Sequence, residues 1–185
     1  MSRIFDWKKG SKTMKSNKFF FSAVIAMLFA VSAFAQTNAF SDANVEYTFD
    51  IPEAAWKQSV KPSATSPNVE FVHGDRSNGH FEIRKVTIKT GESLADAIIS
   101  EEQRLQFQPG YVAGKNENFS GTFDGKIFNY EFVRSGRNMS GRFYFLKADD
   151  KTVYVLRFTG MRDKLRSLRN QTDSIARTFS LKKVK

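Results

Sequence analysis

The chain of 185 residues contains no cysteine and only two histidines, His73 and His80. The missing cysteine excludes disulfides, thiolate zinc sites, a thiol nucleophile and a lipid-modified cysteine. With two histidines, the chain has few candidates for a general base. Neither a Gly-x-Ser-x-Gly nucleophile elbow nor the glycine spacing of a phosphate-binding loop occurs. The sequence therefore predicts a protein that is not an enzyme and needs no cofactor.

The chain also lacks an apolar stretch long enough to span a bilayer. Residues 19–34 carry no charge, but these 16 residues fall short of the about 20 that a membrane helix needs. Basic residues precede the stretch, and Ala33 and Ala35 occupy the positions that signal peptidase reads before Gln36. We therefore expect residues 14–35 to be a signal peptide cleaved between Ala35 and Gln36. The protein is then exported, either periplasmic or secreted, with no transmembrane segment in the mature chain.

The surplus of positive charge is modest once this leader is set aside. Residues 1–35 hold six of the 29 basic and one of the 19 acidic residues, so 23 basic and 18 acidic residues remain. A surplus of this size does not point to a nucleic acid as partner. Residues 1–13 are polar and form either an N-terminal extension or a stretch upstream of a true start at Met14. Residues 36–185 have the length of one domain, which can bury a core without disulfides.

Alternating apolar residues predict several strands. Residues 45–51 place apolar side chains at the odd positions and end at a proline, as a half-buried strand does. Residues 57–68 contain two prolines and four Ser or Thr residues, so we expect a surface loop there. Residues 69–72 and 81–88 are expected to pair as a hairpin. The apolar phase shifts after Ile83, which indicates a bulge or a change of packed face.

Two amphipathic helices are expected in this domain. Ser93 and Asp96 have the spacing of an N-terminal capping box, and one face of the following segment is apolar. The second helix carries a continuous apolar stripe made of Met161, Leu165, Leu168, Thr172, Ile175 and Phe179. Between the helices lie four strand candidates separated by turn residues, at 111–123, 126–133, 142–146 and 152–159. This order predicts an α+β fold, an αβα sandwich with a central, mostly antiparallel sheet and helices packed against it.

The two ends of the domain resemble PsbP-like domains. The opening reads Tyr-Thr-Phe-Asp-Ile-Pro over residues 47–52 and is followed by Trp56. The close reads Tyr-Val-Leu-Arg-Phe-Thr-Gly over 154–160, then a helix, then Ile-Ala-Arg-Thr-Phe-Ser over 175–180. The resemblance covers residues 45–181. It implies the αβα sandwich of the photosystem II extrinsic protein and a binding or assembly role, and it implies no reaction and no functional residue.

Four side chains with metal-ligand chemistry lie near one another in the chain: His73, Asp75, His80 and Glu82. In a regular strand His80 and Glu82 share a face, so a hairpin could gather ligands there. A turn rich in Gly, Asn, Asp and Ser is also typical of a solvated loop. We therefore expect no metal, with these four residues as weak candidates.

Arginines gather on one flank of the last predicted helix. Four of them fall within an arc of about 80° at 100° per residue: Arg162, Arg166, Arg169 and Arg177. Guanidinium groups suit carboxylates and phosphates, so this arc is a candidate surface for an anionic partner, either an envelope protein or an acidic polymer. However, Asp173 lies in the same arc and Asp163 can pair with Arg166, which favours a solvated face with mixed ion pairs.

Three hypotheses for function follow. The first is an exported, non-enzymatic binding or assembly factor of the cell envelope. The second is a carrier of a small apolar or anionic ligand, and the third is a hydrolase that acts on envelope polymers through carboxylates such as Asp124, Glu131 and Asp149. Aromatic residues either fill the core or line a ligand groove; they are Tyr111, Phe119, Phe123, Phe128, Tyr130, Phe143 and Tyr144.

Overall fold

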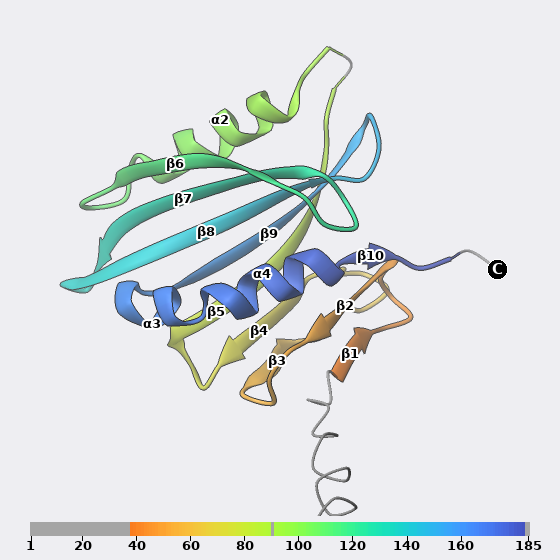
Figure 1. The fold of residues 1–185 in the computed structure, drawn as a ribbon, viewed down its shortest axis with the longest axis horizontal. Coiled ribbons are helices and arrows are strands. Elements are labelled where there is room, and N and C mark those ends of the chain that lie inside the picture. Colours follow the sequence, from red (N-terminus) through yellow and green to blue (C-terminus); the bar gives the residue numbers. More distant parts are fainter. Residues whose placement is uncertain (1–37, 90, 184–185) are drawn as a thin grey trace, which may run out of the picture. The chain divides into compact units, whose positions relative to one another are not determined.

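The structure is a computed structural model that describes residues 38–89 and 91–183 (Figure 1). The predicted signal peptide at 14–35 and its cleavage between Ala35 and Gln36 lie outside the described residues. Both remain predictions.

A seven-stranded antiparallel sheet forms the centre of the fold (Figure 1). Its strand order is β3-β4-β5-β9-β8-β7-β6, and every neighbouring pair runs antiparallel. The strands are β3 (Trp56–Val60), β4 (Val69–His73), β5 (Asp75–Thr87), β6 (Val112–Phe119), β7 (Gly125–Arg134), β8 (Arg137–Lys147) and β9 (Thr152–Met161). The four strands predicted between the helices are thus confirmed as the β6–β9 meander. β5 reaches this meander by pairing with β9.

A second, three-stranded antiparallel sheet has the order β1-β2-β10. It consists of β1 (Asn38–Ser41), β2 (Tyr47–Ile51) and β10 (Ser180–Leu181). The alternation predicted for residues 45–51 is confirmed, because Val45, Tyr47 and Phe49 are buried. These side chains join the core that the last helix covers.

Helices cover both faces of the large sheet (Figure 1). The helices are α2 (Leu94–Leu105), α3 (Arg162–Ser167) and α4 (Arg169–Thr178). α2 buries Ile98 and Leu105 against one face, and the expected capping box of Ser93 and Asp96 is present at its start. α3 and α4 bury Leu165 and Ile175 against the other face. The predicted α+β architecture is therefore confirmed.

Strand β5 faces a different core along each part of its length. Phe81 and Ile83 belong to the core under α3 and α4, whereas Val86 and Ile88 pack in the core under α2. The ladder to β9 runs without interruption from His80 to Thr87. The phase shift after Ile83 is therefore a change of packed face and not a bulge.

Two expectations need correction at the element boundaries. Residues 57–60 belong to β3 and not to a loop, because β3 pairs with β4 at the edge of the sheet and buries Trp56. The β4–β5 turn centres on Gly74, whose φ of +69° is readily adopted by glycine. β5 therefore begins at Asp75, with an irregular register against β4.

The last helix is broken at Leu168 into α3 and α4, because Leu168 adopts φ −87° and ψ 3°. Leu165, Leu168 and the stripe positions of α4 are buried as predicted. Met161 is not part of this stripe: it ends β9 and packs against the core under α2.

Candidate functional site

A groove lies between α3 and the outer strands β6, β7 and β8. It has a volume of about 360 Å³ and is lined by Arg142, Arg162, Arg166 and Arg169, so we call it the arginine groove. Residues 112–114 of β6 form its far wall, and Asn129, Glu131 and Ser140 contribute to its floor. Three of the four arginines predicted as a contact surface therefore lie together. Arg177 does not line the groove.

The floor of the arginine groove follows from the alternation of β7 and β8. Asn129 pairs with Arg142 across these strands, and Ile127 pairs with Tyr144. Side chains on this side face the last helix, whereas the intervening Phe128 and Phe143 face the core under α2. The polar residues between the aromatic ones thus define the helix-facing side of the outer strands.

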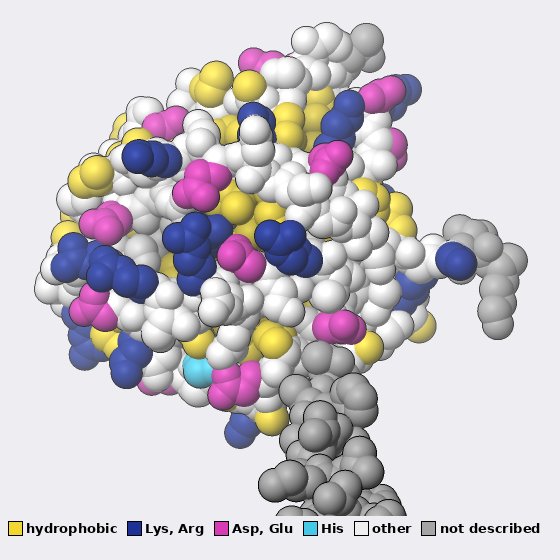
Figure 2. All heavy atoms as spheres, viewed as in Figure 1, with side chains coloured by type: hydrophobic (Ala, Val, Ile, Leu, Met, Phe, Trp, Pro, Cys, Tyr) yellow, Lys and Arg dark blue, Asp and Glu magenta, His cyan; other side chains and the backbone are white. Residues whose placement is uncertain are grey.

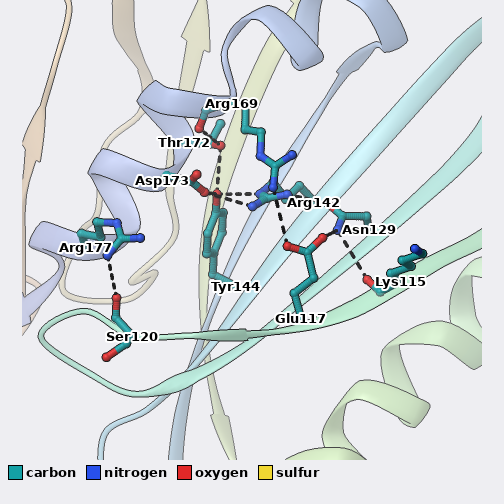
Figure 3. A network of polar contacts seen from close by, with 10 residues as sticks. All are labelled: Lys115, Glu117, Ser120, Asn129, Arg142, Tyr144, Arg169, Thr172, Asp173 and Arg177. Atoms are coloured by element: carbon teal, nitrogen blue, oxygen red, sulfur yellow. Dashed lines mark hydrogen bonds and ion pairs between the residues drawn. The ribbon is translucent and has the colours of Figure 1, made fainter.

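A buried hydrogen-bond network fixes Arg142 at the edge of the arginine groove (Figure 3). Its Nε donates to Tyr144 Oη at 2.7 Å, its Nη1 to Asn129 Oδ1 at 2.8 Å and its Nη2 to Asp173 Oδ1 at 3.0 Å. Tyr144 Oη also lies 3.0 Å from Thr172 Oγ1 and donates to Asp173. The network therefore joins β8 to α4, and it uses the aspartate that the sequence placed among the surface arginines.

Charge states in this network follow from its contacts. Burial raises the pKa of the Tyr144 hydroxyl well above its usual range. Burial alone would lower the pKa of Arg142, but the contacts with Tyr144 and Asp173 outweigh it and raise that pKa. Arg142 is therefore a permanent positive charge with all three of its guanidinium nitrogens engaged, and it is not a free anion-binding group.

The other three groove arginines are held loosely. Arg162 Nη1 lies 3.6 Å from Glu131 Oε2, and Arg169 Nη2 lies 3.6 Å from Glu117 Oε2, distances longer than good hydrogen bonds. Within residues 38–89 and 91–183, Arg166 has no carboxylate in ion-pair contact, so the expected pairing with Asp163 is not found. All these side chains are half-exposed or exposed. An anion entering the groove can therefore reach three guanidinium groups.

Arg177 and the acidic residues complete this face of the molecule. Arg177 Nη1 donates to the carbonyl oxygen of Ser120 at 2.9 Å, and its guanidinium group lies over the Phe119 ring. Figure 2 shows Lys and Arg side chains gathered at the left of this face, where Figure 1 places α3, with single carboxylates between them. The face is thus basic but mixed, as the alternative interpretation of the arginine arc predicted.

The weak metal candidates separate into three places. His80 and Glu82 lie with Glu70 of the neighbouring strand, and their potential ligand atoms are within 4.8 Å of one another. Asp75 instead accepts hydrogen bonds from the Ser77 and Asn78 backbone, and His73 lies 3.5 Å from a carboxylate oxygen of Glu53. Sequence reasoning missed Glu70, which only the β4–β5 register brings to His80.

The Glu70, His80 and Glu82 group is already engaged in ion pairs. Glu70 lies 2.8 Å from His80 Nε2 and 3.2 Å from Arg76, and Arg157 lies 3.2 Å from Glu82. Burial raises the pKa of Glu70, but contacts with His80 and Arg76 outweigh it, so the pKa is lowered overall. A cation here would have to compete with two arginines. The arrangement therefore favours an ion-pair network.

The carboxylates of the hydrolase hypothesis do not converge. Asp124 precedes β7, and Asp149 lies in the β8–β9 turn at the same end of the sheet. Glu131 is six residues along β7 from Gly125, about 20 Å away at the rise of a strand. The aromatic residues considered for a ligand groove are buried or packed against the two cores. In the part of the chain that the structure describes, no helix is both long and apolar enough for a membrane crossing.

Comparison with known proteins shows likeness in structure but not in sequence. No family model matches the chain, and no curated protein sequence is similar to it. Cyanobacterial PsbP from Synechocystis sp. PCC 6803 superposes with a TM-score of 0.54 at 15% identity, over 82% of this chain and 96% of that one. LpqN of Mycobacterium tuberculosis gives 0.52 at 14% identity, over 80% and 92%. Protein PA94 of Pseudomonas aeruginosa gives 0.50 at 17% identity, over 80% and 99%. The chain therefore shares its fold with PsbP and LpqN.

Proposed function

We propose that this protein is a non-enzymatic binding or assembly factor of the cell envelope, and that the arginine groove contacts a carboxylate- or phosphate-bearing partner. The observation that carries the proposal is the loose pairing of Arg162, Arg166 and Arg169. An arginine in a bidentate pair with a carboxylate has its charge matched by that partner, whereas Arg162 and Arg169 face theirs at 3.6 Å and Arg166 has none among the described residues. The groove therefore supplies donors that a partner's anionic groups can accept.

The location in the envelope has two further supports, a sequence prediction and a likeness in fold. The leader predicted at residues 14–35 would direct the protein out of the cytoplasm. LpqN, which shares the fold, is described as involved in cell envelope biogenesis. Neither of them identifies the partner, so the proposal is limited to the chemistry that the groove recognises.

Glu117 and Glu131 compete with an anionic ligand for the arginines of the groove. Each carboxylate faces an arginine at 3.6 Å, so a bound anion has to displace it or share its arginine. The triple variant Arg162→Gln/Arg166→Gln/Arg169→Gln should bind a short polyglutamate peptide at least about tenfold more weakly in low salt. The variant Glu117→Gln/Glu131→Gln should bind it severalfold more tightly. Titration calorimetry with the same peptide measures both.

Two controls accompany this titration. The thermal midpoint of the triple variant should stay close to that of the wild type, because exposed ion pairs contribute little to stability. Added salt should weaken binding, since exposed charges are screened over about 8 Å at physiological ionic strength. A wild-type protein that ignores the peptide, or an envelope partner retained equally by the wild type and the triple variant, contradicts the proposal.

A second candidate function is a carrier of one small anionic ligand. The observation in its favour is the volume of the groove, about 360 Å³, which falls within the range of small-molecule sites. A dicarboxylate that binds as tightly as the peptide would favour the carrier. A preference for the longer peptide would favour the binding factor.

A further inference from the structure

The β7–β8 hairpin ends in two arginines that face each other. The turn is Ser135–Gly136, with φ of 52° and 70°, and Arg134 pairs directly with Arg137 across it. Like charges opposite each other on neighbouring strands destabilise a hairpin. Arg134 lies over the Phe132 ring, but neither arginine has a carboxylate within ion-pair distance among residues 38–89 and 91–183, so an anion outside the turn would relieve the repulsion.

Three more basic side chains surround this turn. Arg76 and Arg134 line a hollow of about 410 Å³ together with Arg137. A second hollow of about 330 Å³ is lined by Arg137, Arg162 and Lys164. The two hollows share Arg137. We call this set of five residues the basic end: Arg76, Arg134, Arg137, Arg162 and Lys164.

Exposed apolar side chains lie at the same end of the sheet. Phe107, in the loop between α2 and β6, is 91% exposed, and Val112 at the start of β6 is 59% exposed. The loop is held against the hairpin because the Val133 N–H donates to the carbonyl oxygen of Pro109 at 2.7 Å. Phe107 is two residues before Pro109, and Arg134 follows Val133. The loop that carries Phe107 therefore lies beside the strand end that carries Arg134.

The acidic residues near the basic end are partly engaged. Glu70 pairs with Arg76, and Glu131 faces Arg162. Asp75 accepts hydrogen bonds from Ser77 and Asn78. Asp163 lines the second hollow, so it reduces the positive charge there. Arg134, Arg137 and Lys164 have no carboxylate within ion-pair distance among residues 38–89 and 91–183, and all three side chains are exposed, so the unpaired positive charge is concentrated around the β7–β8 turn.

We propose that the basic end and Phe107 dock the protein on the surface of an anionic lipid bilayer. Basic side chains are attracted to the negative potential of such a surface, and an aromatic side chain can insert at the level of the headgroups. The five basic residues come from both sides of the hairpin, so one small anion cannot contact them all. A soluble acidic polymer would satisfy the arginines but would leave Phe107 in water. The combination of charge and an exposed ring therefore fits a bilayer better.

Vesicle sedimentation tests the docking surface. The protein is purified from culture, and its intact mass identifies the residue at which it begins. It is then mixed with phosphatidylcholine vesicles that either contain or lack phosphatidylglycerol. The wild type should sediment with the anionic vesicles in low salt. Arg134→Glu/Arg137→Glu should weaken binding at least about tenfold, and Phe107→Ser on the order of fivefold. Comparison between variants cancels any contribution of residues 1–37.

Matched controls lie at the other end of the sheet. Lys147 is ten residues along β8 from Arg137, about 33 Å away, and the β8–β9 turn follows it. Lys147→Glu/Lys151→Glu changes the net charge as much as the arginine double variant does, yet should keep most of the binding. Leu181→Ser, at an apolar residue 39% exposed on β10, should also keep it.

Several outcomes overturn the proposal. They are no sedimentation of the wild type, equal binding to neutral vesicles, equal losses in the lysine controls, and an unchanged affinity of Phe107→Ser. Binding of polyglutamate through Arg134 and Arg137 without vesicle binding would assign the basic end to a soluble polyanion. The double variant Arg166→Gln/Arg169→Gln tests the proposed function separately, because neither residue belongs to the basic end, whereas Arg162 of the triple variant lines both sites.

Discussion

The hydroxyl group of Tyr144 is the point where β8 and α4 share polar contacts. It lies among Arg142, Thr172 and Asp173, and the Tyr144 side chain is fully buried. Tyr144→Phe removes one hydrogen-bonding group from Arg142 and Thr172, which are buried, and from Asp173, which is only partly exposed. We expect the free energy of unfolding to fall by about 1–3 kcal/mol, measured by urea denaturation.

Tyr154→Phe is the matched control for Tyr144→Phe. Tyr154 Oη donates to Glu46 at 2.6 Å, and this carboxylate is half-exposed. Water can replace the lost contact at Glu46, so the loss of stability should be smaller. An equal loss in the two variants would mean that the Tyr144 network is no more than an ordinary surface contact.

Glu46 makes stability depend on pH. Burial would raise its pKa, but hydrogen bonds from Lys85 and Tyr154 outweigh this effect and lower the pKa from 4.5 to about 2. A lowered folded-state pKa gives stability that is present above pH 4.5 and is lost as the pH falls toward 2. Wild type should therefore exceed Glu46→Gln in stability above pH 4.5, and the difference should vanish near pH 2. Urea denaturation at both pH values measures it, and a difference independent of pH contradicts the assignment.

The last helical segment has one buried and one exposed side. Leu168, at the break between α3 and α4, and Ile175 of α4 are buried in the core. Replacing either with alanine should lower the free energy of unfolding by about 2–5 kcal/mol. Arg166→Ala and Arg169→Ala should each cost under about 1 kcal/mol, because both side chains are exposed. Chemical denaturation compares the four variants, and similar losses on the two sides would contradict this orientation.

Element types were predictable wherever one face of an element is buried. The spacing of Leu165, Leu168 and Ile175 predicted their burial because a helix repeats every 3.6 residues. The break at Leu168 left that spacing nearly unchanged, so the apolar pattern carried no sign of it. β3 was missed because it is a short edge strand whose partner, β4, lies across a loop containing two prolines.

Contacts between distant segments were beyond the reach of sequence patterns. Arg142 enters the arginine groove from β8, and Glu117 reaches Arg169 from β6. Arg76 joins Arg137 although 60 positions separate them. Each of these three placements depends on strand order and register, which local periodicity does not specify. The arc brought together three arginines that line one groove, while the partners of those arginines required the fold.

Arg162 links the two surfaces proposed for the whole molecule. It lines both the arginine groove and the hollow that contains Arg137 and Lys164. Of these two sites, Arg169 lines only the arginine groove, and Arg137 lines only the hollow with Lys164. Because all three residues are at least half-exposed in their surroundings, replacing one with glutamine removes a charge with little effect on folding. Glutamine variants of Arg137, Arg162 and Arg169 should therefore separate polyglutamate binding from vesicle binding.

Single neutralisations give the expected pattern. Arg169→Gln should weaken polyglutamate binding severalfold and leave vesicle binding unchanged, whereas Arg137→Gln should do the reverse. Arg162→Gln should weaken both, because its guanidinium group lies where the two sites meet. Titration with the peptide and sedimentation with anionic vesicles, on the same preparations, measure the two effects. If Arg137→Gln and Arg169→Gln weakened both kinds of binding equally, the two surfaces would act as one diffuse positive field, and separate roles for the groove and the basic end would be wrong.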